Sequence, residues 1–315
     1  MKLKKLLQTI IILIVLASAY YIFYGEETFS NELQVENGIM EVAFCPYSDC
    51  ETFFIQKLST SEDIKCAFYD LNLENLTNTL NLKGAEVLVF EDNYENFGKE
   101  VFSAGLMHNK FCILDEKAVI TGSMNPTNNG AYKNNNNLIY IESKILANNY
   151  LKEFEELNLD LPDYKTKTTK FTFNNATVEN YFCPEDNCKE EVLSELRLAQ
   201  EEIVFMTFSF TDVDIANILI QKNKTMKVTG LLEKNRINQQ YNVHKYLNKT
   251  DMKVFLDNNS NTMHHKVFII DGKTVITGSY NPTKSATTKN DENILIFHNE
   301  KVAEVFLNEF NRLTQ

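Results

Sequence analysis

The sequence predicts an α/β protein whose globular part is built from two duplicated α/β sandwich halves. Three observations lead to this fold class. The chain has 315 residues, of which 43% are hydrophobic and 23% charged, values typical of a globular protein with a sizeable core. One stretch occurs twice, at residues 107–141 and 263–297, with 17 of 35 positions identical at an offset of 156. Strand patterns alternate with helix patterns around both copies, which indicates layered α/β halves.

Residues 1–25 are predicted to form a membrane anchor or signal segment. Three lysines within the first five residues precede the uncharged run Leu6–Gly25, about the 20 residues that a helix needs to cross a bilayer. This charge asymmetry predicts a single-pass protein of the cell membrane, with its N-terminus in the cytoplasm and its catalytic domain on the extracytoplasmic side. Ala17-Ser18-Ala19 also fits a cleavage site, so secretion after signal cleavage is the alternative. The aromatic run at 20–24 favours the anchor.

The first half is assigned to residues 38–158. Its strands are expected at Met40–Phe44, Ile64–Tyr69, Glu86–Phe90, Lys110–Leu114, Ala118–Thr121 and Leu138–Ile141, and its helices at Cys50–Leu58 and Lys144–Leu157. A polar stretch without periodicity, residues 159–172, is assigned as the connector.

The second half is assigned to residues 173–315 and repeats the pattern. Its strands are expected at Ile203–Phe208, Lys227–Leu232, Lys253–Leu256, Val267–Ile270, Thr274–Thr277 and Ile294–Phe297, and its helices at Lys189–Ala199, Val213–Gln221 and Lys301–Leu313. This half contains 18 extra residues around 234–248.

The formal net charge is −12 at neutral pH, which excludes a basic coat that binds nucleic acid over the whole surface. Any phosphate site must therefore be a local cluster of basic groups. Six cysteines are too few for a disulfide-dense small protein, and their spacing shows no four-ligand zinc pattern.

The repeated stretch predicts a β-hairpin in each half. The first turns on Asp115-Glu116 and the second on Asp271-Gly272, the latter a strong two-residue hairpin signal. With Leu114 facing Lys117, His108 lies across from Ser123, and the same geometry places His264 across from Ser279.

Each half thereby gathers an imidazole, a cation and two neutral hydrogen-bonding groups, the composition of a phosphate site beside a nucleophile or acid. The members are His108, Lys110, Ser123 and Asn125 in one copy and His264, Lys266, Ser279 and Asn281 in the other. Asp115 and Asp271 are roughly 20 Å of strand from the histidines, at about 3.3 Å per residue. We therefore expect them to set the turns and not to touch substrate. We expect His265 to be a structural or surface residue and His244 and His298 to lie on the surface.

These residues resemble the signature of the phospholipase D superfamily, His-x-Lys-x4-Asp followed by Gly-Ser-x-Asn, present here twice. Phe208-Ser209-Phe210-Thr211 and Asn290-Asp291-Glu292-Asn293 also look like that family, and the resemblance covers nearly everything after residue 38. It implies two halves packed face to face as a pseudo-dimer with one active site between them. It also implies that one histidine attacks phosphorus while the other protonates the leaving oxygen and then activates water, with no metal and no cofactor.

The nucleophile must be neutral while the acid is protonated, so the site needs two imidazoles with different pKa values. The resemblance implies that His108 is the nucleophile and His264 the acid, because the first-motif histidine of that family usually attacks. Lys110 and Lys266 would stabilise the charge on the non-bridging oxygens, and the motif Ser and Asn residues would position the phosphate. The family's acidic position holds Glu292 in the second copy but Asn136 in the first. Only one imidazole can therefore have a carboxylate partner, and the sequence leaves open which one; an eroded first half is an alternative explanation.

The cysteines at equal spacing, Cys45/Cys50 and Cys183/Cys188, predict one local disulfide in each half in an oxidising compartment. Cys66 and Cys112 lie in strand-like runs and are expected to be buried free thiols.

The favoured function is hydrolysis of phosphodiester bonds, with nucleic acid as the substrate. The halves are compact and leave little room for an acyl channel. A phospholipase D or phosphatidyltransferase acting on membrane phospholipid is the first alternative, supported by the anchor. A non-catalytic cell-surface binding module is the second. Two motifs in one chain make a monomer sufficient.

Overall fold

The structure is a computed structural model that describes residues 33–161 and 164–315. Val35 to Gln315 form one compact unit. The expected membrane segment, residues 1–25, lies outside the described residues. In the part of the chain that is described, no helix is both long enough and apolar enough to cross a bilayer.

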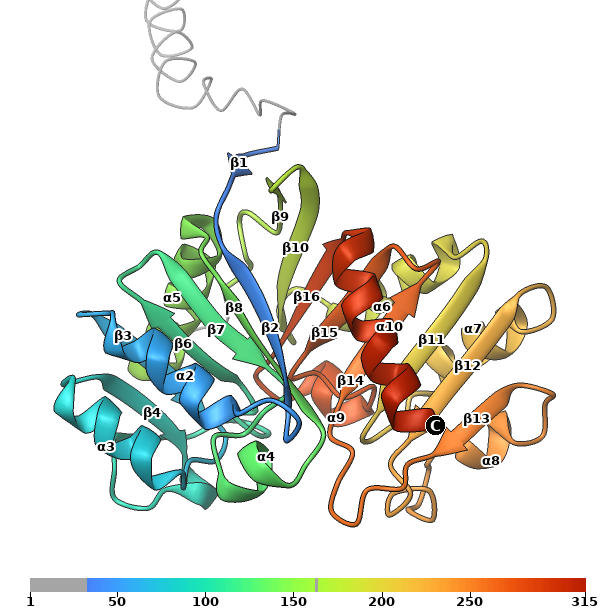
Figure 1. Ribbon diagram of the computed structural model, residues 1–315, viewed down its shortest axis with the longest axis horizontal. Helices are drawn as coiled ribbons and strands as arrows, with labels where there is room; N and C mark the ends of the chain where they lie inside the picture. The colour runs from blue at the N-terminus through green and yellow to red at the C-terminus, as the bar shows by residue number, and fades with distance from the viewer. Residues whose placement is uncertain (1–32, 162–163) are drawn as a thin grey trace, which may run out of the picture. The chain divides into compact units, whose positions relative to one another are not determined.

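The strands of the described residues form two sheets, which confirms the mixed α/β class (Figure 1). The seven-stranded sheet runs in the order β2 (Met40–Cys45), β8 (Asn136–Ile141), β7 (Ala118–Gly122), β6 (Lys110–Leu114), β3 (Ile64–Phe68), β4 (Glu86–Phe90) and β5 (Lys99–Val101). The nine-stranded sheet begins with β1 (Val35–Glu36) and β9 (Lys170–Phe173) and continues with β10 (Ala176–Cys183), β16 (Glu292–His298), β15 (Thr274–Gly278), β14 (Lys266–Ile270), β11 (Glu202–Thr207), β12 (Lys227–Leu232) and β13 (Lys253–Leu256).

The two sheets repeat one topology. From β10 to β13 the strand order of the second sheet matches that of the first from β2 to β5, with β3–β4–β5 and β11–β12–β13 parallel and the other neighbours antiparallel. The duplication seen in the sequence is therefore a duplication of the whole sheet, with β1 and β9 added to one copy.

The helices surround these sheets. The longer ones are α2 (Cys50–Ser59), α3 (Glu74–Leu82), α5 (Lys144–Leu159), α6 (Cys188–Leu198), α7 (Val213–Lys222) and α10 (Glu300–Thr314), and single-turn elements are α4 (Asn128–Tyr132), α8 (His244–Leu247), α9 (Lys284–Thr288) and η1 (Glu91–Asn93). Ser143 and Asn299 cap the N-termini of α5 and α10 by accepting backbone N–H groups.

The apolar side chains form three cores. A central core contains residues of both halves, including Tyr150 and Phe154 of α5 and Phe306 and Phe310 of α10. One outer core lies beneath α2 and α3, and another beneath α6 and α7. Because the central core is shared, the two halves bury apolar surface against each other, and this burial holds the facing sheet ends in place.

Two of the elements that the sequence pattern did not predict show why: β10 and α3. β10 contains Glu179 and Asn180, both buried, which interrupt the apolar alternation by which a strand is recognised. The helix α3 is rich in Asn and Thr and buries only Leu76 and Leu80, too weak an apolar stripe to identify it.

The hairpin register differs by one residue from our expectation. Leu114 pairs with Ala118, not with Lys117, and Ile270 pairs with Thr274. The N–H of Lys117 donates to the carbonyl of Leu114, and that of Lys273 to the carbonyl of Ile270. Each hairpin therefore has a three-residue loop, because strand pairing begins one residue after this hydrogen bond. This extra residue breaks the predicted opposition of His and Ser within one half.

The cysteines form three disulfides, and none is free in the described part of the chain. Cys45–Cys50 and Cys183–Cys188 are bonded. The expectation of free thiols at Cys66 and Cys112 is wrong. These two residues lie directly opposite each other on β3 and β6 and form the third disulfide, an opposition that only the strand pairing creates.

Candidate active site

The two motif histidines are held in one site by backbone from opposite halves. Isolated bridges join Met107 to Asp291 and Asn135 to Met263. The N–H of His108 donates to the carbonyl of Asp291 at 2.9 Å, and the N–H of His264 donates to that of Asn135 at 2.8 Å. Each histidine therefore precedes its own strand, β6 or β14, but is anchored to the other half.

His108 is paired with a buried carboxylate from the second half. Its Nδ1 lies 2.7 Å from Oε2 of Glu292 on β16. The hydroxyl of Ser279 donates to the same oxygen at 2.7 Å, and the amide of Asn290 donates to Oε1 at 3.1 Å. The carboxylate is fully buried, and the question of which imidazole Glu292 reaches is answered: it is His108.

His264 has the same surroundings with an amide in place of the acid. Its Nδ1 lies 2.9 Å from Oδ1 of Asn136 and 3.0 Å from the carbonyl of Ser123. The hydroxyl of Ser123 donates to Oδ1 of Asn136 at 3.2 Å. Asn136 in turn donates to the carbonyl of Gly130 at 2.9 Å, which directs its oxygen toward the imidazole.

The predicted pairing of His with Ser within one half is therefore wrong. The pairs cross between halves, because the site forms where the two sheets meet and not across one hairpin. Ser123 and Ser279 were also expected at the phosphate. Their hydroxyls instead donate to Asn136 and Glu292 and accept the N–H groups of Asn137 and Asn293, so they orient the residues that orient the imidazoles.

Both motif lysines are buried beside the histidines. The ammonium of Lys110 donates to the carbonyl of His108. That of Lys266 donates to the carbonyl of His264 at 2.8 Å and lies 3.0 Å from its Nε2. Burial lowers the pKa of Lys110 to about 7, against the opposing effect of Glu292 and Asp70. Burial and the charge of Lys110 hold the pKa of Lys266 well below its usual value.

The surroundings of both imidazoles favour their neutral forms. Burial lowers the pKa of His108 to about 4, although Glu292 acts in the opposite direction. Burial and the cations Lys266 and Lys110 hold the pKa of His264 well below its usual value. Each histidine is only 7% exposed, so a substrate can reach it from one edge only. With Nδ1 donating to an oxygen, the lone pair is on Nε2, and that of His264 lies 3.0 Å from the ammonium of Lys266.

The two motif asparagines carry free hydrogen-bonding capacity. The side-chain oxygens of Asn125 and Asn281 are buried, and no partner is found for either among the described residues. Buried polar atoms are normally satisfied, so these equivalent amides are available to a ligand.

The motif aspartates lie at the hairpin turns. Asp115 accepts the N–H groups of Glu62 and Asp63 at 2.8 and 2.9 Å. Asp271 accepts those of three consecutive residues, 200–202, at 2.7 to 2.9 Å. Burial raises the pKa of both carboxyls, but the backbone N–H groups outweigh it and lower the pKa. The aspartates thus tie each hairpin to the start of β3 or β11.

Sequence reasoning missed a duplicated network behind the site. The residue after each motif histidine, Asn109 or His265, contacts a buried glutamate of its own half and an asparagine of the other half. The contacts are Asn109–Glu153 at 2.6 Å, Asn109–Asn293 at 2.7 Å, His265–Glu309 at 3.2 Å and His265–Asn137 at 3.2 Å. All three pairs of positions obey the same offset of 156, a signal that extending the repeat alignment would have found.

Two aromatic rings flank the imidazoles: Phe208, from a stretch that resembles the family, and Tyr69, which the sequence analysis missed. The Tyr69 ring lies 5.0 Å from that of His108, and the Phe208 ring 4.6 Å from that of His264. Their N–H groups donate to the carbonyls of Asn109 and His265 respectively, so the two aromatics occupy equivalent places in the two halves.

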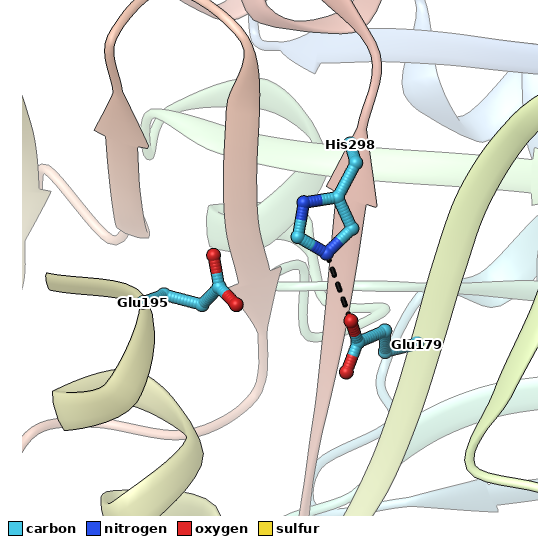
Figure 2. Close-up of side chains that lie close together, drawn as sticks. All are labelled: Glu179, Glu195 and His298. Carbon is cyan, nitrogen blue, oxygen red and sulfur yellow. Dashed lines mark hydrogen bonds and ion pairs between the residues drawn. The ribbon is translucent and has the colours of Figure 1, made fainter. Parts of the chain in front are cut away.

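A further group of ionisable side chains lies at the far end of β16. Figure 2 shows Glu179, Glu195 and His298; a carboxylate oxygen of each glutamate and a ring nitrogen of the histidine lie within 4.8 Å of one another. Burial would raise the pKa of Glu179, but hydrogen bonds from His298 at 2.8 Å, Lys170 at 2.7 Å and Tyr181 at 2.6 Å outweigh it and lower the pKa to about 2. Both oxygens of Glu179 are thus occupied, and the group is a network joining β9, β10 and β16.

Comparison with known proteins places this geometry in a family. The family model described as "Cardiolipin synthase, PLD-like domain" matches residues 60–158 and 192–314. A protein named phospholipase D from Rickettsia prowazekii is 31% identical over 180 residues, which cover 56% of this chain and 86% of the relative. A mitochondrial cardiolipin hydrolase from Xenopus tropicalis is 30% identical over 131 residues, 41% of this chain and 62% of that protein.

Two solved structures are also similar to this chain. The phospholipase D family member Nuc from Salmonella typhimurium is 32% identical and covers 44% of this chain and 93% of its own, with a TM-score of 0.42. Phosphatidylserine synthase from Haemophilus influenzae covers 87% of both chains with a TM-score of 0.65 at 13% identity, a likeness of fold. With both motifs in place and more than half of its residues matched by the family model, this chain belongs to the phospholipase D superfamily.

Proposed function

We propose that this protein is a phosphodiesterase that hydrolyses nucleic acid through a covalent phosphohistidine. The observation that carries the proposal is the crossed pair of imidazoles, each held at Nδ1 by a residue of the other half and each beside a buried lysine. Two imidazoles with different partners suit a reaction that needs a nucleophile and an acid at once.

His108 is the nucleophile in this proposal. Its Nδ1 proton is donated to Glu292, which leaves the Nε2 lone pair facing the substrate. As the N–P bond forms and the P–O bond to the leaving group breaks, the imidazole becomes cationic. The carboxylate at 2.7 Å stabilises that charge, while Lys110 and Lys266 balance the negative charge on the non-bridging oxygens.

His264 acts as acid and then as base. An incoming phosphate brings negative charge beside a cluster of cations and raises the pKa of the His264 imidazole, so that its Nε2 takes up a proton from solvent. The imidazolium then donates this proton to the leaving oxygen. In the second step the neutral imidazole takes a proton from water, the hydroxide attacks phosphorus, and the N–P bond to His108 breaks. The cycle uses only water and side chains of this chain.

The groups beside the imidazoles support nucleic acid as the substrate. They are aromatic and charged, namely Tyr69, Phe208, Lys110 and Lys266, the types that bind a sugar–phosphate chain. A phospholipid is the second candidate, favoured by the family description and by relatives named phospholipase D and cardiolipin hydrolase.

A substrate panel tests the proposal. The full chain, purified in mild detergent with EDTA, would be offered bis(p-nitrophenyl) phosphate, single- and double-stranded DNA, RNA, and mixed micelles containing phosphatidylcholine or cardiolipin. We expect turnover of the chromogenic diester and of nucleic acid. Turnover of lipid alone would reverse the ranking, and a folded protein without any turnover would favour the binding module.

We also propose an extracytoplasmic location for the catalytic domain. Three disulfides with no free cysteine in the described residues suit an oxidising compartment, in agreement with the charge pattern of residues 1–25. Protease added to intact cells should degrade the domain. Protection of the domain until the cells are lysed would contradict this location.

A further inference from the structure

The two halves carry opposite charge on the loops that border the active site. Strands β4 and β12 lie in the same register beside β3 and β11, so the first residues after them can be compared by counting from the last paired residues, Val89 and Leu232. Glu91 and Asp92 in the first half correspond to Lys234 and Asn235 in the second, and Asn93 corresponds to Arg236. Both loops leave the strand ends beside the imidazoles, the usual place for ligands in parallel strand units.

Arg236 lies next to the reacting groups and lacks an acidic partner. Its guanidinium carbon is 4.3 Å from the centre of the Phe208 ring, and that ring contacts the His264 imidazole. The ammonium of Lys266 lies 5.2 Å from the same ring. No carboxylate of the described residues forms an ion pair with Arg236, and the side chain is half-buried, so its charge is available to an anion.

Lys234 strengthens this cationic flank. Its ammonium donates to the carbonyl of Asn259 at 2.5 Å, and no acid among the described residues pairs with it. A carbonyl positions the ammonium without neutralising it. The neighbouring carboxyl groups, Glu233 and Asp257, are buried and accept backbone N–H groups, so the side chains left to meet an anion on the His264 side are Lys234 and Arg236.

The first half presents the opposite sign at the equivalent place. Tyr69 occupies the position of Phe208, and it is followed by the half-buried carboxyl of Asp70, whose pKa burial and Glu95 raise. Glu91 and Asp92 stand where Lys234 and Asn235 stand in the other half. A second anionic group would therefore be repelled on the His108 side and attracted on the His264 side.

We propose that Lys234 and Arg236 form a subsite for a second phosphate, carried by the leaving fragment of an oligonucleotide. The assignment rests on the proposed function, because His264 as the acid places the leaving group on this flank. It predicts that the substrate binds in one direction only. The fragment retained on His108 lies on the acidic flank, and the next phosphate lies against Arg236.

Three dinucleotides test the subsite. The substrates are TpT, pTpT and TpTp, which differ only in a terminal phosphate and in the end that bears it. We expect the full-length wild-type protein to cleave one of the two phosphorylated forms with a kcat/KM roughly tenfold to 100-fold above that of TpT, the effect of one charge-assisted contact. Arg236→Gln should remove most of this preference, and Arg236→Lys should keep part of it.

Lys245→Gln is the matched control. Lys245 is exposed on α8, further along the same connection between β12 and β13, and its loss also removes one positive charge. This variant should keep the wild-type preference, whereas Glu91→Gln should improve cleavage of the disfavoured isomer. Thermal unfolding of each variant checks that the fold is intact.

The outcomes separate this inference from the proposed function. If the protein cleaves bis(p-nitrophenyl) phosphate and all three dinucleotides equally well, or if Arg236→Gln keeps the preference, the subsite is refuted and the phosphodiesterase stands. If it cleaves cardiolipin micelles but no nucleotide, the nucleotide assignment of the subsite is wrong. No cleavage of any diester by a folded protein overturns both.

Discussion

The two halves share one backbone plan but surround their imidazoles differently. His108 faces the buried carboxylate of Glu292, whereas His264 faces the amide of Asn136. The supporting serines, the bridges between halves and the buried lysines are the same on both sides. A single change from acid to amide thus separates two imidazoles that the duplication would otherwise make equivalent.

The difference has a direct electrostatic meaning. A carboxylate stabilises an imidazole that becomes positively charged, as a phosphohistidine does, while an amide only fixes the tautomer. The side with the carboxylate suits the nucleophile, and the side with the amide suits a group that gains and loses a proton as substrate arrives and departs. An eroded first half would be expected to lose its supporting contacts as well, and they are present.

The largest effect is expected from the histidines themselves. His108→Ala and His264→Ala should each lower turnover of natural diesters by at least about 10⁴-fold. On bis(p-nitrophenyl) phosphate, whose leaving group needs no proton, His264→Ala should still release about one equivalent of nitrophenol per protein in a burst, whereas His108→Ala should release none. Rapid-mixing absorbance measures this. A burst from His108→Ala alone would exchange the two roles.

The next largest effect is expected from the two residues that contact Nδ1 of the imidazoles, the acid Glu292 and the amide Asn136. Glu292→Gln should reduce kcat by about 10²- to 10⁴-fold, because the cationic phosphohistidine loses its counter-charge. Asn136→Asp, the matched change on the other side, should cost much less, since it only raises the pKa of His264. Steady-state kinetics with thermal unfolding as a fold control compares them. Equal losses would mean that the halves are interchangeable.

The pH profile provides a third comparison. His108 has a pKa lowered to about 4, so the neutral nucleophile is present above that pH and lost below it. Lys110 has a pKa lowered to about 7, so its cation is present below that pH and lost above it. The kcat/KM should therefore rise through pH 4. It should fall first as His264, the acid, loses its proton below its usual pKa, and again through pH 7 as Lys110 loses its charge, by up to about tenfold per unit in each case. Lys110→Arg should move the alkaline limb upward, and an unmoved limb would assign it to another group.

The hairpin aspartates should affect stability more than rate. Asp115→Asn should lower the free energy of unfolding by about 1–2 kcal/mol, a modest value because the group is half-exposed, and Asp271→Asn by somewhat more, because it accepts three N–H groups instead of two. Both pKa values are lowered in the fold, so this contribution is present at neutral pH and is lost as the pH falls below 3.8. Urea unfolding measures it. An intact fold with no activity would contradict a structural role.

The smallest effect lies in the turns. Glu116 has a φ of 51° where the other hairpin has Gly272 with a φ of 59°, a conformation that costs a residue with a side chain roughly 1 kcal/mol. Glu116→Gly should therefore stabilise the protein by up to about 1 kcal/mol, and Gly272→Ala should destabilise it by a similar amount. Steric crowding would not cause this loss of stability, because a Cβ at Gly272 meets nothing within 4 Å. Unchanged stability in both variants would mean that the turn relaxes.

Local patterns predicted much of this molecule. The repeat revealed two copies of one sheet, and strand periodicity located most of their strands, because apolar alternation is a property of neighbouring residues. β10 and α3 escaped because buried polar residues and a weak apolar stripe carry no such periodicity. The Cys66–Cys112 disulfide escaped because it depends on which strands pair.

The sequence by itself determined the duplication, the motif residues and the presence of one acid where symmetry would provide two. Only the tertiary structure decided that Glu292 reaches His108, that the His–Ser relations cross between halves, and that opposite charges border the two sides of the site. The physical reason is distance along the chain: His108 and Glu292 are 184 residues apart, and they meet because a shared apolar core packs the two sheets together. No local pattern records that packing.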